Sequence, residues 1–308
     1  FTSKAIDQLG IALKFDPNFA EAFNNLGNIY NDRADLPSAR QNFLHCLDLK
    51  PSSHEAFWNL TGVSDNIDQA MDLLLLSIEK NRDYRPAITT LAGLKAFTGD
   101  TQFFRTICES EFKNDPIIRS FKWIFQLPNS PVIKFNRWAM FDYAISMAQT
   151  DRAFYEFGVW MGGSFRYLAP HFSKSYGFDT FDGLPEDWGT ITKGEYSSFS
   201  QVPLIDGANF CVGRFEDTLP EFFSVERPIS GVLNFDADLY SSTICALECA
   251  LPAMDDKTIL LFDEFLVNEH WENDEYRALE EFCEKHQLEY EVLAVSIFSK
   301  QMMCRLIF

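Results

Sequence analysis

Residues 154–165 of the chain read FYEFGVWMGGSF, an apolar run that passes through glycines into the helical stretch SFRYLAPHF. Gly158, Gly162 and Gly163 are spaced as in a strand-to-helix turn, where glycine lets the backbone approach a ligand closely. The acidic Glu156 before this turn suits a cationic amino group or a ribose hydroxyl rather than a pyrophosphate. The dinucleotide spacing GxGxxG is absent, which disfavours a nicotinamide cofactor. The alternative interpretation is a tight turn without a ligand.

Apolar runs alternate with helical stretches from about Asp151 onwards. The strands expected after the first are SYGFDTF (175–181), ISGVLNFDADLY (229–240), KTILLFDEF (257–265) and two closing runs, LEYEVLAVS and QMMCRLIF. This alternation predicts a mostly parallel sheet with helices on both faces. We therefore expect residues 126–308 to form a Rossmann-like α/β domain, in which ligands bind at the carboxyl ends of the strands.

Acidic side chains end three of these expected strands. Asp179 ends the second, where an acid commonly accepts hydrogen bonds from a ribose diol, although a turn or capping role is the alternative. Asp236 and Asp238 end the third strand, and Asp263 and Glu264 end the fourth. Such clustered carboxylates repel one another unless a cation or a ligand neutralises them. Oxygen ligands and few histidines favour Mg²⁺ over zinc, whereas capping of the following helices is the alternative.

Five motifs in this half resemble those of the macrocin O-methyltransferase family, in the same order over roughly residues 150–308. They are FGVW with Gly162-Gly163, FDTFDGLP (178–185), GRFEDTLP (213–220), DADLYSST (236–243) and DEF (263–265). The resemblance implies a class I methyltransferase fold, S-adenosylmethionine as the cofactor, and Mg²⁺ bound near a sugar hydroxyl. The chain departs from the family where the usual Asp-Asp pair is Asp263-Glu264, because glutamate is one methylene longer.

The resemblance also assigns the residues of the site. Those expected to hold the methionine part of the cofactor are Glu156, Gly158, Trp160, Gly162, Gly163 and Ser164. Asp179 would bind the ribose, and Phe215 and Asp217 would lie near the adenine. Asp236 is expected to border the cofactor and, with Asp263 and Glu264, to bind the metal.

Two residues are candidates for accepting the proton of the substrate hydroxyl as it attacks the sulfonium methyl group. Asp236 could serve as this base besides binding a metal that lowers the pKa of the hydroxyl. His270 is the histidine closest in sequence to the metal strand, and its alternative interpretation is a solvent-facing loop residue. Three other functions stay open: a scaffold that has lost catalysis, a nicotinamide oxidoreductase and a protein methyltransferase.

The first part of the chain contains an internal repeat. Four residues recur after 34 positions: Ala5, Leu9, Ala12 and Pro17 are matched by Ala39, Phe43, Cys46 and Pro51. This is the tetratricopeptide period. We therefore expect residues 1–125 to form a helical tetratricopeptide array, with one complete unit from Ala20 to about Ser53 and a further helix before Phe1. Such arrays bind a protein or peptide on their concave face or serve as dimerisation platforms.

Composition restricts the partners further. The formal net charge of −19 repels the phosphate backbone, so a nucleic acid is not an expected partner. Seven cysteines without a CxxC pair indicate reduced thiols in a cytoplasmic compartment. No apolar run is long enough to span a bilayer, so a membrane is not expected either. The expected partners are a small hydroxylated or sugar-like acceptor, a protein on the repeats and, as an option, a second copy of the chain.

Overall fold

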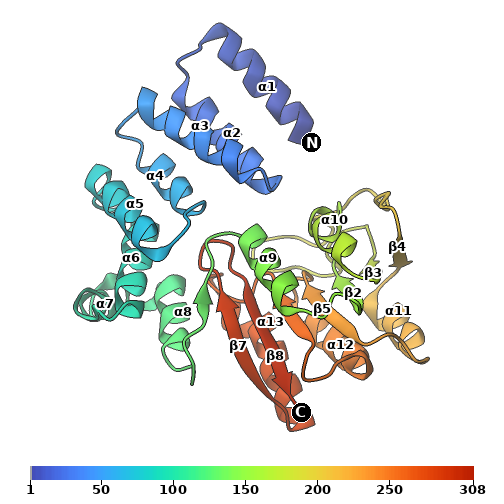
Figure 1. Ribbon diagram of the computed structural model, residues 1–308. Coiled ribbons are helices and arrows are strands. Elements are labelled where there is room, and N and C mark those ends of the chain that lie inside the picture. The colour runs from blue at the N-terminus through green and yellow to red at the C-terminus, as the bar shows by residue number, and fades with distance from the viewer. Residues whose placement is uncertain (1) are drawn as a thin grey trace. The chain divides into compact units, whose positions relative to one another are not determined.

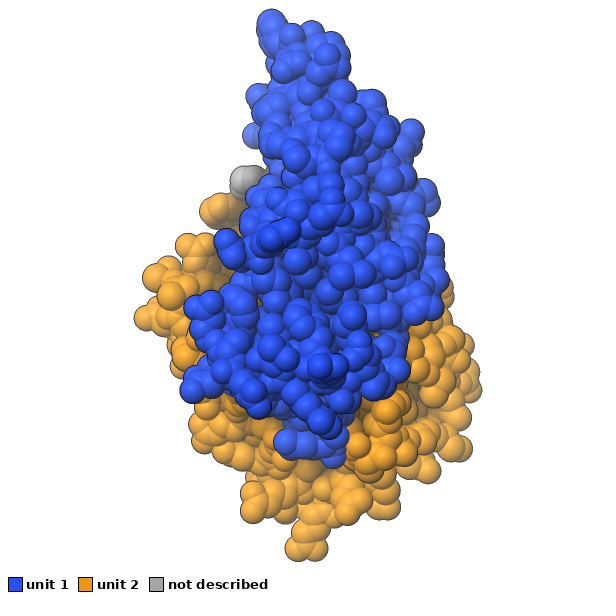
Figure 2. Space-filling view, turned by 90° about the vertical axis from the view of Figure 1, so that its left-hand side faces the viewer, with its two compact units in different colours: residues 1–126 blue, residues 127–308 orange. Residues whose placement is uncertain are grey.

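The chain forms two compact units in the computed structural model, residues 1–126 and residues 127–308 (Figure 1 and Figure 2). The structure describes residues 2–308, so the expected helix before Phe1 lies outside it. No helix of the described chain combines the length and the apolar character that crossing a bilayer requires.

The described residues of the first unit form helices joined by short turns. The helices are α1 (Thr2–Phe15), α2 (Ala20–Asp32), α3 (Leu36–Leu49), α4 (His54–Thr61), α5 (Ile67–Lys80), α6 (Arg85–Phe97), α7 (Gln102–Cys108), the 3₁₀ helix η1 (Glu111–Asn114) and α8 (Pro116–Ile124). The first residues of α1 and α3 are 34 positions apart (36 − 2), and so are those of α2 and α4 (54 − 20). The repeat seen in the sequence is thus a repeat of helices, whereas the assignment to the tetratricopeptide family stays a prediction.

Close packing between α2 and α3 depends on one small residue. A Cβ atom on Gly27 would lie 2.4 Å from Cε1 of Phe43, so the aromatic ring occupies the space that a side chain would need. Ala39 and Phe43 are both buried on the facing side of α3. Helix α3 ends at Leu49, two residues before Pro51, which lacks the N–H needed for another turn.

The second unit is built on an eight-stranded sheet in the order β1-β7-β8-β6-β5-β2-β3-β4 (Figure 1). The strands are β1 (Val132–Ile133), β2 (Ala153–Phe157), β3 (Lys174–Asp179), β4 (Ala208–Val212), β5 (Ser230–Phe235), β6 (Ile259–Phe262), β7 (Glu289–Val295) and β8 (Met302–Ile307). Neighbouring strands are parallel except at β8, which runs antiparallel to both β6 and β7. The mixed α/β sheet agrees with the expected fold class, but β1 and β4 were not among the expected strands.

Helices cover both faces of this sheet. They are α9 (Arg137–Met147), α10 (Gly163–Leu168), η2 (Ala169–His171), α11 (Phe215–Phe222), α12 (Tyr240–Ala250), η3 (Leu251–Ala253), η4 (Trp271–Asn273) and α13 (Glu275–His286). Phe154 and Tyr155 are consecutive in β2, so their side chains point to opposite faces. Phe165 of α10 packs on Phe154, whereas Phe222 of α11 packs on Tyr155. The sheet is therefore buried between two helical layers.

Four phenylalanine rings lie side by side at the carboxyl ends of adjacent strands. Phe178, Phe157, Phe235 and Phe262 are paired in register across β3, β2, β5 and β6. Their ring centroids are 5.2, 5.1 and 4.8 Å apart, and all three neighbouring pairs are stacked. All four rings are buried. This aromatic row gives the sheet a continuous apolar layer directly below the residues that follow the strands.

Candidate functional site

The carboxyl ends of β2 and β5 lie at the point where the order of the sheet reverses. From β2 the chain passes outward to β3 and β4, and it then returns to β5 on the other side of β2. Helices follow β2 and β5 on opposite faces in such a doubly wound sheet, which opens a crevice outside the strand ends. Gly158, Asp179 and Asp236 lie at the ends of three adjacent strands at this reversal point, since Phe157 pairs with both Phe178 and Phe235.

The turn after β2 is held tightly against the end of β5. Gly158 has φ +90°, and a Cβ atom there would lie 1.8 Å from the carbonyl oxygen of Asp236. Its N–H donates to the carbonyl oxygen of Phe178 at 2.9 Å. Gly162 also has positive φ, +74°, and precedes helix α10. The positive φ angles at positions 158 and 162 account for glycine there, whereas binding of a ligand by this turn stays a prediction.

Asp179 binds this turn through its side chain. Its Oδ2 accepts hydrogen bonds from the backbone N–H groups of Val159 and Trp160, each at 2.7 Å. Its Oδ1 accepts one from the N–H of Phe181, also at 2.7 Å. A carboxylate can accept about four hydrogen bonds, so roughly one acceptor position is left for a ligand hydroxyl. The residue expected to bind a ribose is therefore also a structural part of the turn.

Glu156 is a fully buried acid beneath the turn. Asn234 donates to its Oε1 at 2.7 Å, while Oε2 and the amide oxygen of Asn234 have no hydrogen-bond partner within the described residues. Burial raises the pKa of Glu156 to about 8, although hydrogen bonds with Ser164 and Asn234 act in the opposite direction. Trp160 and Gly163 on the turn above are exposed, whereas Ser164 is buried. Glu156 can thus offer an acceptor to a cationic group that reaches the turn.

The start of α11 lies beside Asp179, because the N–H of Gly213 donates to its carbonyl oxygen at 3.0 Å. Phe215 is buried and packs edge-on against Phe157, with ring centroids 6.1 Å apart. Asp217 is exposed in the first turn of the helix. The segment expected near the adenine is therefore adjacent to the segment expected near the ribose.

The acids that follow β5 are partly buried next to other carboxylates. Burial and then the neighbouring Asp263 raise the pKa of Asp236 well above its usual value, while Arg137 lowers it. Asp238 has φ +61°, and burial with the neighbouring Glu264 raises its pKa to about 7. Each carboxylate thus makes it harder for the next to ionise. A carboxylate with a raised pKa, such as Asp236, is suited to accepting a proton near neutral pH.

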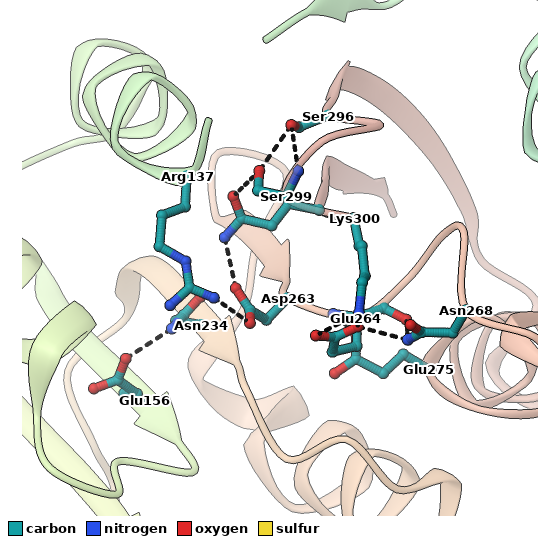
Figure 3. Close-up of polar contacts among 11 residues, drawn as sticks. Arg137, Glu156, Asn234, Asp263, Glu264, Asn268, Glu275, Ser296, Ser299 and Lys300 are labelled. Atoms are coloured by element: carbon teal, nitrogen blue, oxygen red, sulfur yellow. Dashed lines mark hydrogen bonds and ion pairs between the residues drawn. The ribbon is translucent and has the colours of Figure 1, made fainter. Parts of the chain in front are cut away.

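Figure 3 shows that the acids after β6 are bound by amide and cationic side chains. The carboxylate of Asp263 accepts from Nη2 of Arg137 and from Nε2 of Gln301, each at 2.7 Å. Nζ of Lys300 lies 3.0 Å from Oε2 of Glu264, and Nδ2 of Asn268 donates to the same oxygen at 2.5 Å. Nζ of Lys300 also donates to Oε1 of Glu264 at 3.4 Å, so both oxygens of Asp263 and both of Glu264 have protein donors.

The three expected Mg²⁺ ligands do not fit a divalent cation in this arrangement. Arg137 lies 2.7 Å from Asp263, and Lys300 lies 3.0 Å from Glu264. A metal ion bound to either carboxylate would lie close to one of these positive charges and would be repelled by it. No group of three or more His, Cys, Asp or Glu side chains in residues 2–308 is arranged to hold a metal ion. The magnesium ion implied by the resemblance is thus not supported by the geometry of these residues.

His270 is placed differently from the acids. It is exposed and lies in the loop before η4. Its charge acts on Asp274, a residue that also accepts from Nε1 of Trp188 at 3.2 Å. Among residues 2–308, no hydrogen bond or ion pair joins His270 to Asp236. A role as proton acceptor stays a prediction for both residues, and Asp236 is the one at the reversal point of the sheet.

Several residues of this site were missed in the sequence. Arg137 begins helix α9, 126 residues before Asp263, and Lys300 lies in the turn between β7 and β8. Glu275 is fully buried at the start of α13 and accepts from the N–H of Glu264 at 3.0 Å. No local pattern marks these positions, because their partners are distant in sequence.

Similarity to known proteins is found only among solved structures. No model of a known protein family and no curated protein matches the sequence. The calicheamicin methyltransferase CalS11 is 17% identical over 72% of this chain and 93% of its own, with a TM-score of 0.46. The O-methyltransferase NovP is 19% identical over 56% of this chain and 80% of its own, with a TM-score of 0.41. MamA is 23% identical over 38% of this chain and 74% of its own, with a TM-score of 0.33. Values this low do not establish a family or an activity.

Proposed function

We propose that the chain is an S-adenosylmethionine-dependent O-methyltransferase that acts on a hydroxyl of a small or sugar-like acceptor. The observation that carries this proposal is the glycine turn, which lies against the backbone of Asp236 and is tied to Asp179 at the reversal point of the sheet. Ligands of doubly wound sheets bind at this point. The resemblance of five ordered motifs to the macrocin O-methyltransferase family names the ligand.

The residues at the strand ends match the parts of this cofactor in polarity. The free Oε2 of Glu156 is an acceptor for the amino group of the methionine part. The remaining acceptor position of Asp179 suits a ribose hydroxyl. Phe215, which is buried beside this acid, provides an apolar surface for the adenine.

The cofactor supplies an electrophilic methyl group on a sulfonium centre, and the protein has to orient the acceptor hydroxyl and take its proton. We assign the proton to the carboxylate of Asp236, whose pKa is raised by burial and by Asp263. Arg137 acts in the opposite direction and lowers this pKa, which favours the ionised form that a base requires. Holding the hydroxyl in line with the methyl group contributes much of the rate, since sulfonium is already a good leaving group.

The finer parts of the proposal concern the metal and the helical repeats. Assistance by Mg²⁺ is left out of the reaction, because Arg137 and Lys300 are bound to two of the three expected ligands. We assign the first unit to a tetratricopeptide array that binds a protein or peptide or mediates dimerisation. Its support is the 34-residue spacing of the helix starts and the close packing at Gly27.

The first test is isothermal titration of the protein with S-adenosylmethionine and S-adenosylhomocysteine. We expect both to bind and Asp179→Asn to weaken them by roughly 10-fold or more, the usual effect of losing a hydrogen bond to a charged group. The matched control is Asp182→Asn, an exposed acid in the next turn, whose side chain accepts from Ser200. Unchanged binding in Asp179→Asn, or binding of a nicotinamide dinucleotide instead, would refute the cofactor assignment.

The acceptor can be sought by measuring release of S-adenosylhomocysteine with a panel of sugars, sugar nucleotides, catechols and peptides. We expect release with a hydroxylated small molecule and its loss in Asp236→Asn with cofactor binding retained. Release with a peptide alone would identify a protein methyltransferase.

A second candidate function is a cofactor-binding scaffold without catalysis. The observation that favours it is that Arg137 and Lys300 form ion pairs with Asp263 and Glu264. These are two of the acids that were expected to bind a metal near the acceptor hydroxyl. Binding of S-adenosylmethionine without methyl transfer to any acceptor class would support this function.

A further inference from the structure

The strand ends after β5 and β6 gather more negative charge than a protein interior tolerates without compensation. Asp263 and Glu275 are buried, and Asp236, Asp238 and Glu264 are partly buried beside them. A positive charge is needed here if these groups are to stay ionised.

Two side chains of the protein supply positive charge at this place (Figure 3). Arg137 reaches Asp263 from the start of α9 with an N–O distance of 2.7 Å. Lys300 reaches Glu264 from the turn before β8 with an N–O distance of 3.0 Å. The two come from different segments and bind the two adjacent acids that the resemblance assigns to a metal.

The two cations lie close together at the end of one strand. Asp263 and Glu264 are adjacent in the chain, so the two cations act at one place, directly after β6.

We infer that Arg137 and Lys300 replace the divalent cation, so that the acidic site is complete without a metal. The remaining amide donors support this arrangement: Gln301 occupies the second oxygen of Asp263, and Asn268 binds Glu264. If the chain is the methyltransferase proposed above, on which this consequence rests, its reaction does not require Mg²⁺. The charge replacement itself can be tested without any cofactor or acceptor.

The test uses Mn²⁺ as the probe on the full chain, with free Mn²⁺ measured by electron paramagnetic resonance and thermal unfolding recorded with and without the ion. We expect the unaltered protein to bind no Mn²⁺ at millimolar concentration and to keep its melting temperature. The double variant Arg137→Gln with Lys300→Gln is expected to gain Mn²⁺ affinity by roughly 10-fold or more, the scale on which residues around a metal site change affinity. Its melting temperature should then rise when Mn²⁺ is added.

The matched control is Arg152→Gln with Lys285→Gln, which removes two other ion pairs, those with Asp255 and Glu248, at 2.8 and 2.9 Å. This control should gain no Mn²⁺ affinity. Should the double variant not fold, Lys300→Gln alone gives the same comparison, because Lys300 is 39% exposed and its loss leaves the buried Asp263 paired.

Tight Mn²⁺ binding by the unaltered protein that Asp263→Asn abolishes would overturn the inference. So would a folded double variant that binds no Mn²⁺ and unfolds at the same temperature as the unaltered protein. Neither result depends on S-adenosylmethionine, so each is distinguishable from a failure of the proposed function. If methyl transfer is found, addition of a chelator should leave its rate unchanged.

Discussion

Nη2 of Arg137 lies 2.7 Å from Oδ2 of Asp263, and this ion pair joins the start of α9 to the carboxyl end of β6. Asp263 is buried, whereas Arg137 is 38% exposed. Arg137→Gln should destabilise the protein by roughly 1 to 3 kcal/mol, less than the loss of a fully buried partner because solvent screens the exposed end. Urea denaturation measures this loss. Arg137→Lys should recover part of it, and a Gln variant as stable as the unaltered protein would contradict the pairing.

The turn after β2 should not tolerate a side chain at Gly158. An added Cβ would lie 1.8 Å from the backbone oxygen of Asp236, and φ is +90°. Gly158→Ala should therefore cost about 3 kcal/mol or more, from strain and from overpacking. The control is Gly163→Ala, where nothing lies within 4 Å of the added Cβ. Equal stability of the two variants in urea would contradict the close approach of the turn to β5.

The buried Glu156 predicts how stability varies with pH. Its pKa rises from 4.5 to about 8 on folding, chiefly by burial. Between these values the folded chain binds a proton that the unfolded chain has released, so this group makes stability fall as pH rises. Glu156→Gln should remove up to about 1.4 kcal/mol per pH unit of that decline. Urea denaturation from about pH 5 to about pH 8 measures the slope.

The control for this pH dependence is Asp255→Asn. The hydrogen bond from Arg152 lowers the pKa of Asp255, so its contribution to stability is lost only as pH falls into the acid range. The slope above about pH 5 should therefore be the same as in the unaltered protein. A slope that Glu156→Gln leaves unchanged would show that the group is ionised in the folded chain.

Truncation of a ring in the aromatic row should be costly. Phe235 is stacked between Phe157 and Phe262, with centroid distances of 5.1 and 4.8 Å. Phe235→Ala should destabilise the protein by about 3 to 5 kcal/mol, the usual range for a buried phenylalanine. Phe199→Ala is the control, because that ring is 70% exposed, and it should change stability by less than about 0.5 kcal/mol. Equal losses of stability in the two variants would contradict the stacking of Phe235 in the aromatic row.

Helix packing in the first unit can be tested in the same way. The Cβ of Gly27→Ala would lie 2.4 Å from a carbon of the Phe43 ring, so the variant should be destabilised by about 1 to 3 kcal/mol. Gly10→Ala in α1 meets nothing within 4 Å and should gain about 0.5 to 1 kcal/mol from its better helix propensity. Thermal unfolding compares the two, and a stabilising Gly27→Ala would refute the close approach of α2 and α3.

Three of the strands predicted from the sequence are buried apolar runs. Every residue of β2, β5 and β6 is buried, and each strand ends in a phenylalanine followed by a polar or glycine residue. Strand β4 lies at the edge of the sheet with no fully buried residue, so its sequence, ANFCV, carries no such signal. The expected runs also extended beyond the strands, because Val159 and Leu239 stay buried within the turns that follow.

The candidate site was predictable only where the signal is local. Gly158, Asp179 and Asp236 directly follow or end apolar runs, so chain position alone puts them at one edge of the sheet. The cations that bind Asp263 and Glu264 come from segments 126 and 36 residues away. Contacts with such remote partners depend on the tertiary fold. From the sequence alone, the acids have no visible cationic partner, and they therefore indicate a metal site.

The two backbone amides that Asp179 binds fix the shape of the turn before any ligand arrives. A binding site that is already ordered spends little conformational entropy on complex formation. Association should accordingly be a single kinetic phase with no slow rearrangement behind it. The same preorganisation would make the turn selective, because a ligand with a bulkier group at this position would have to break two charge-assisted hydrogen bonds to enter.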